Sequence, residues 1–130
     1  MTPSDTRSHD AHCASHLARL WMLADDEASA AVPDVLTQQV TRITGMILTE
    51  AESAGRAVMI TMAEGPRAAA AERFLAARLA RMASAAQDVT AAARRGDAAA
   101  LRRQLRWFDT LTSAMWAVLT ALRPGPPVSH

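Results

Sequence analysis

The chain has 130 residues, the length of a single domain that can bury one hydrophobic core, so no second domain is expected. Its 14 basic and 13 acidic residues leave a net charge of +1, which excludes a general attraction of the whole protein to nucleic acid or anionic lipid. The single Cys13 excludes an intramolecular disulfide, and no apolar run approaches the ~20 residues that a membrane-spanning helix needs.

The first predicted helix covers residues 9–31, after a flexible polar lead over residues 1–8. Its apolar residues recur at intervals of three or four, which places them on one helical face. Pro33 follows this pattern and ends it. The apolar stripe consists of Cys13, Leu17, Leu20, Ala24 and Ala28.

The second predicted helix covers residues 34–64, with Asp34 in the first turn, where a carboxylate favours the helix dipole. Gly45 and Gly55 each cost about 1 kcal/mol relative to alanine, so a break at Gly55 followed by a strand over 57–62 is the alternative. The rest of the chain offers no second strand to pair with it, and we therefore expect a helix. The apolar stripe consists of Leu36, Val40, Ile43, Ile47, Ala51, Ala54, Val58 and Met62.

The third predicted helix covers residues 66–95 and the fourth covers 97–123, before a flexible Pro-rich tail over 124–130. Between them, Gly96 supplies the left-handed residue that ends a helix, and Asp97 caps the next one. This turn is therefore short and antiparallel. The third stripe consists of Ala71, Leu75, Leu79, Met82, Ala86, Val89 and Ala93, and the fourth of Leu101, Leu105, Phe108, Met115, Leu119 and Leu122.

These segments predict an all-α fold, an up-down-up-down four-helix bundle. In that topology the start of the first helix, the end of the second, the start of the third and the end of the fourth meet. We call this the histidine end. It is expected to gather His9, His12, Cys13, His16, Met59, Met62, Phe74, Met115 and Trp116.

Four potential metal ligands share one sector of the first helix, at positions i, i+3, i+4 and i+7: His9, His12, Cys13 and His16. Pairs of them suit zinc or copper, bound by neutral imidazole and thiolate, and haem is a further option. One ion cannot take all four, because seven residues advance a helix by about 10 Å. No complete metal motif is present, and the alternative is that Cys13 continues the core stripe while the histidines are solvated.

Five arginines cluster at the opposite end, at the corner between the third and fourth helices: Arg94, Arg95, Arg102, Arg103 and Arg106. They form a candidate anion-binding site for phosphate or nucleic acid, beside Trp107, which suits stacking on a base. Asp25, Asp26 and Glu27 of the first helix support the alternative, in which the charges pair between helices on a solvated face.

The fourth helix is apolar nearly all round, although a single bundle core uses only one sector of a helix. It is either packed centrally or has a surplus face that forms a subunit interface. We expect the interface and a homodimer, which also suits the mixed apolar face at 58–62. The candidate interface residues are Trp107, Leu111, Trp116 and Val118.

Composition also bears on the source and location of the protein. Lysine, asparagine and tyrosine are absent together, which predicts coding bias in a GC-rich bacterial genome. Met1–Ser8 is polar where a secretory signal needs an apolar stretch, so we expect a cytoplasmic protein.

Together the patterns predict a non-enzymatic bundle that acts by self-association and by binding a protein partner or a small apolar ligand. No phosphate-cradling Gly loop, serine nucleophile motif or pair of carboxylates on one helix face supports catalysis. A metal- or haem-binding role for the N-terminal His/Cys face is the alternative. Binding of nucleic acid or phosphate at the arginine corner is the third hypothesis.

Overall fold

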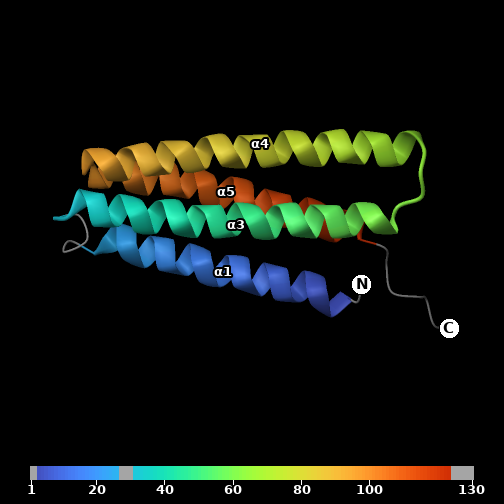
Figure 1. Ribbon diagram of the computed structural model, residues 1–130, viewed down its shortest axis with the longest axis horizontal. Helices are drawn as coiled ribbons and strands as arrows, with labels where there is room; N and C mark the ends of the chain where they lie inside the picture. Colours follow the sequence, from blue (N-terminus) through green and yellow to red (C-terminus); the bar gives the residue numbers. More distant parts are fainter. Residues whose placement is uncertain (1–2, 27–30, 124–130) are drawn as a thin grey trace.

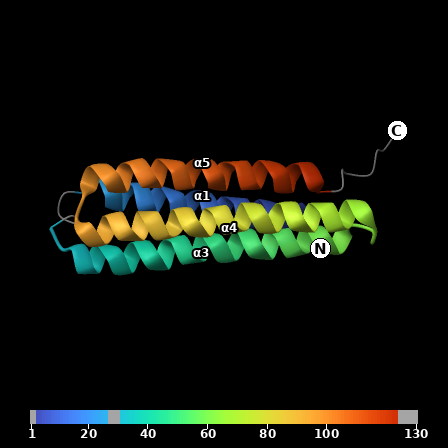
Figure 2. The same cartoon turned by 90° about the horizontal axis from the view of Figure 1, so that it is seen from above.

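The computed structural model describes the backbone of residues 3–26 and 31–123, and the side chains of 11–26 and 31–123. Over these residues the protein is all-helical, with four α-helices and no strand. The helices are α1 (Pro3–Asp25), α3 (Pro33–Thr61), α4 (Pro66–Arg95) and α5 (Ala98–Leu122). They lie side by side along the length of the molecule, and the chain reverses direction from each helix to the next (Figures 1 and 2).

The helix bounds differ from the sequence-based ranges mainly in α1. This helix begins at Pro3 instead of residue 9, so much of the predicted flexible lead is helical. Proline is tolerated in the first turn of a helix, because the backbone N–H that it lacks would have no helical partner there. The helix can therefore begin at Pro3, although the first residues have no apolar periodicity from which this start could be predicted. The α1 helix ends at Asp25, ahead of the predicted residue 31. Glu27 and the predicted tail over 124–130 lie outside the described residues.

The second predicted helix is continuous through Gly55, because α3 extends from Pro33 to Thr61 without a break. The alternative, a strand over 57–62, is wrong. Val58 is fully buried in the core, which shows what holds this part of the helix in place. Burial of the apolar face outweighs the low helix propensity of the two glycines.

The corner between α4 and α5 has the predicted geometry. Gly96 adopts the left-handed conformation, with φ 68°, and its N–H bonds back to the carbonyls of Ala92 and Ala93. The Asp97 side chain accepts a hydrogen bond from the backbone N–H of Ala100 at 3.0 Å. A glycine C-cap is therefore followed directly by an aspartate N-cap, and this fixes a tight reversal.

The core is formed by the apolar stripes of the four helices. Its largest fully buried side chains include Phe108 of α5, Leu20 of α1, Ile47 of α3 and Met82 of α4. The α5 helix contacts α1, α3 and α4, so it buries more than one line of its residues. The burial of Leu111 and Trp116 in addition to the main stripe shows that the core uses a broad sector of α5, which accounts for much of its apolar character.

Polar contacts join α1 to α5 at the edge of the core. The Trp21 indole Nε1–H donates to Asp109 Oδ2 at 2.9 Å, and Arg102 Nη1 lies 4.0 Å from Asp25 Oδ1.

Among the described helices, none has the length and hydropathy needed to cross a membrane.

Candidate functional site

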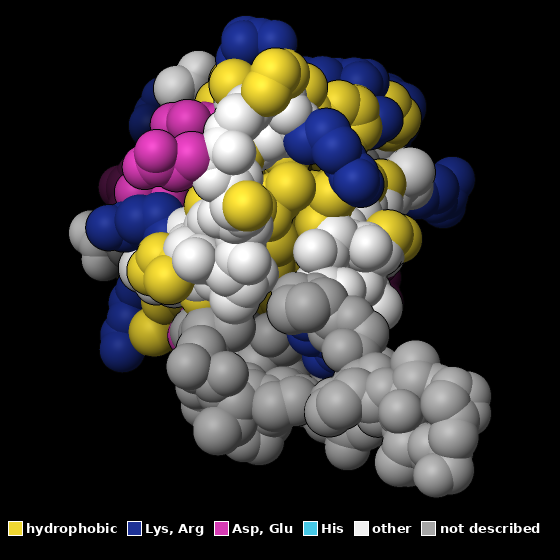
Figure 3. Space-filling view, turned by 90° about the vertical axis from the view of Figure 1, so that its right-hand side faces the viewer, with side chains coloured by type: hydrophobic (Ala, Val, Ile, Leu, Met, Phe, Trp, Pro, Cys, Tyr) yellow, Lys and Arg dark blue, Asp and Glu magenta, His cyan; other side chains and the backbone are white. Residues whose placement is uncertain are grey.

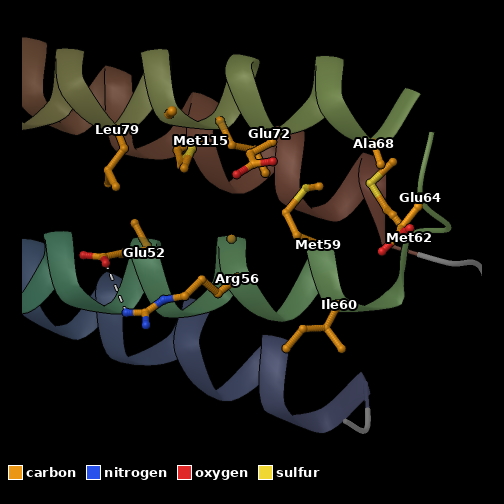
Figure 4. A pocket seen from close by; sticks show the side chains of 14 residues that line it. Glu52, Arg56, Met59, Ile60, Met62, Glu64, Ala68, Glu72, Leu79 and Met115 are labelled. Atoms are coloured by element: carbon orange, nitrogen blue, oxygen red, sulfur yellow. Dashed lines mark hydrogen bonds and ion pairs between the residues drawn. The ribbon is translucent and has the colours of Figure 1, made fainter. Parts of the chain in front are cut away.

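An apolar groove lies between α3 and α4, toward the end of the molecule where α3 ends and α4 begins. Its volume is about 510 Å³, within the range of sites that bind small organic molecules. Figure 4 shows the lining side chains on the two facing helices, with Met59 and Glu72 extending into the space between them. The lining residues are Ala51, Glu52, Gly55, Arg56, Met59, Ile60, Met62, Glu64, Ala68, Glu72, Leu75, Ala76, Leu79 and Met115.

The floor of the groove is apolar. Met115 of α5, which is only 1% exposed, reaches the groove from behind the two helices that form its walls. Leu75 and Leu79 line it from α4, while Ala51 and Gly55 line it from α3. The α3 wall therefore has its smallest residues at this level, and their short side chains leave room that a core of larger residues would fill.

Methionines lie along the groove toward its open end. Met59 and Met62 line it from α3 and the residue that follows α3, and both are partly exposed. Met59 extends from α3 toward α4, and Met62 lies beside Ala68 and Glu64 (Figure 4). Methionine side chains are flexible and polarizable, so this wall can adapt to ligands of different shape.

The rim of the groove is charged. Arg56 Nη2 lies 3.1 Å from Glu52 Oε1, one helical turn away on α3. Glu72 of α4 and Glu64, between α3 and α4, are exposed, and neither forms an ion pair within the part of the chain that the structure describes. Acidic side chains gather on one flank of this end of the molecule (Figure 3).

The lining contains no histidine, cysteine, serine or threonine among the described residues, and its polar side chains are three glutamates and one arginine. The groove thus combines an apolar floor with charged groups at its edge, an arrangement also found in sites that bind small molecules.

The predicted metal-ligating residues do not converge in the described part of the molecule. The side chain of His9 lies outside it. The His12 side chain is exposed, and its Nδ1 lies 3.6 Å from Glu50 Oε1 on α3. The Cys13 thiol is buried and donates to the Ile47 carbonyl oxygen at 3.9 Å, consistent with a place in the core stripe.

His16 is half-buried, and its Nδ1 has no hydrogen-bond partner among the described residues. Over those residues no group of three or more histidine, cysteine, aspartate or glutamate side chains is arranged to hold a metal ion. Neighbouring positions on a helix point in different directions, which is why the exposed His12 and the buried Cys13 separate.

The five arginines of the predicted anion site lie around the α4–α5 corner, and all are exposed. Arg102 faces Asp25 of α1, as the ion-pairing alternative required. The others, Arg94, Arg95, Arg103 and Arg106, present their guanidinium groups to solvent.

The four predicted interface residues are divided between the core and the surface. Leu111 and Trp116 are buried within the chain, and Trp116 Nε1 has no hydrogen-bond partner among the described residues. Val118 is half-buried, and Trp107 is 46% exposed beneath the guanidinium of Arg81. Packing of α5 against the other helices accounts for the burial of Leu111 and Trp116.

Sequence reasoning placed Met59, Met62 and Met115 at one end of the molecule but did not predict a groove. The available signal was the pairing of small residues on adjacent helices: Ala51 and Gly55 on α3 are matched by Ala68 and Ala76 on α4. Small residues on both walls leave space when the helices do not approach more closely at that level.

Comparisons with known proteins add no further assignment. No protein-family model matches the chain, and neither the curated proteins nor the solved structures compared with it give a match. The structure therefore defines the class, an all-helical protein with an apolar groove, and its function is argued from that groove.

Proposed function

We propose that this protein is a non-enzymatic binding protein, and that the groove between α3 and α4 takes a small apolar ligand. The observation that carries the proposal is the cavity of about 510 Å³ lined by Gly55, Leu75, Leu79 and Met115. An apolar ligand bound there removes its own surface and that of the groove from water, and this burial stabilises the complex by about 25 cal/mol per Å² of apolar area.

Titration with Nile red, a neutral dye that fluoresces in apolar surroundings, tests this proposal. We expect saturable binding with one site per chain. Because the ligand binds the folded state, saturating dye raises the midpoint of thermal unfolding. Fluorescence that increases linearly without saturation, together with an unchanged midpoint, would contradict the proposal.

We further infer that the four helices form an up-down-up-down bundle and that two copies associate through the outer surface of α5. Opposite directions of successive helices support the first inference (Figure 1). For the second, the support is the exposed indole of Trp107 and the partly exposed Val118. Exposed tryptophans are enriched at subunit interfaces.

Light scattering at tens of micromolar protein tests the association. We expect twice the mass of one chain, and the mass of one chain after Trp107→Glu. The matched control is Phe74→Glu, which places the same charge at an equally exposed aromatic residue of α4. A single-chain mass for the unmodified protein would rule out the dimer.

A further inference from the structure

We infer that the groove between α3 and α4 selects lipophilic organic cations, such as quaternary ammonium or phosphonium compounds, over anions of the same shape. This inference rests on the proposed function, because it requires that the groove bind an apolar body. It adds a charge preference, and the distribution of charged side chains around the groove supports that preference.

The rim of the groove has an excess of negative charge. It contains three carboxylates, Glu52, Glu64 and Glu72, and one guanidinium, Arg56. Arg56 lies 3.1 Å from Glu52, so these two charges largely cancel at a distance. Three carboxylates less one guanidinium leave two negative charges, those of Glu64 and Glu72.

These two carboxylates lie where a bound ligand would meet them. The Glu72 side chain extends from α4 into the space between the helices, and Glu64 lies at the open end beside Met62 (Figure 4). A ligand with its apolar body over Met115 and Leu79 would therefore hold a charged end near one carboxylate or both. Near a protein surface the effective dielectric constant is lower than in bulk water, so the attraction between such charges is stronger there.

The basic residues of α4 nearest the groove, Arg67, Arg73, Arg78 and Arg81, are not among its lining residues. Arg78 stacks over the ring of Phe74 at 5.0 Å, and Arg81 over that of Trp107 at 5.7 Å. Neither arginine lines the groove. An anion in the groove would thus face two carboxylates without an available guanidinium, since the lining Arg56 already pairs with Glu52.

The lining also determines how a cation is recognised. It contains no aromatic side chain among the described residues, so cation–π contact with an aromatic cage is not the source of selectivity. The charge preference comes from carboxylates that are exposed to solvent, and salt therefore weakens it.

The test compares tetraphenylphosphonium with tetraphenylborate, two ions of nearly identical shape and opposite charge, by their displacement of Nile red and by calorimetry. At low ionic strength we expect the cation to bind at least about tenfold more tightly than the anion. The double variant Glu64→Gln, Glu72→Gln should reduce this ratio to within about threefold, because it removes the two unpaired negative charges of the rim.

The matched control is Asp34→Asn, Asp88→Asn, which removes the same charge at exposed sites outside the groove and should keep the preference. If Nile red binds but the two ions bind equally, or the anion binds more tightly, the charge inference is wrong while the proposed function stands. A preference that persists in the glutamine variant also overturns the inference. If neither the dye nor the ions bind, both proposals fail.

Discussion

We expect the substitution Gly55→Leu to weaken the proposed binding of an apolar ligand without destabilising the fold. No heavy atom beyond the neighbouring residues and the helix's own backbone lies within 4 Å of the position that a Cβ would take at Gly55. A leucine there extends into the groove that Gly55 lines, and occupies the volume that the ligand needs. We expect at least about tenfold weaker Nile red binding, since apolar contacts worth more than about 1.4 kcal/mol are lost.

The free energy of unfolding should stay level or rise by up to about 1 kcal/mol, because leucine has a much higher helix propensity than glycine. The measured free energy of unfolding therefore distinguishes a variant whose groove is blocked from one that is destabilised. The control is Gly45→Leu, at the other glycine inside α3, which also has open space around its Cβ position but lines a separate groove farther along α3 and α4. That variant should gain stability and keep its affinity. Wild-type affinity in Gly55→Leu would show that the dye binds elsewhere.

The largest effect on stability is expected for Phe108→Ala. Phe108 is fully buried in α5, which contacts all three other helices, so truncation leaves a cavity that the surrounding helices cannot readily close. Such substitutions cost about 3–5 kcal/mol. Because single domains have only about 5–15 kcal/mol in total, urea unfolding followed by circular dichroism should show a much lower midpoint.

Phe74→Ala is the control for this measurement. It makes the same chemical change at a residue of α4 that is 45% exposed, and we expect a loss below about 1 kcal/mol. Equal midpoints for the two variants at one protein concentration would refute the central place of Phe108 in the core.

Features that depend on neighbours in the chain were predictable from the sequence. The Gly96–Asp97 corner is an example, because both its left-handed turn and its side-chain cap involve residues within one helical turn. Periodicity likewise identified buried residues such as Ile47 and Leu105, since a stripe at helical spacing has to face the core.

Features that depend on how helices pack were not predictable in the same way. Trp116 lies off the main stripe of α5, yet it is buried, because α5 packs against other helices over a broader sector than that stripe covers. The contact between His12 and Glu50 depends on the relative positions of α1 and α3, which no local pattern specifies. The groove is a space between two helices, and its volume follows from their separation as well as from the residues on their walls.

The short connection between Thr61 and Pro66 has a consequence for how this protein can diversify. It includes Gly65, whose φ of 141° is one that L side chains rarely adopt, and it joins the two walls of the groove at its open end. Under the proposed function, insertions or deletions in this connection would alter the separation of the two walls and with it the size of the molecules that fit between them. The Gly96–Asp97 corner, which joins α4 to α5, would be left unchanged by such insertions or deletions.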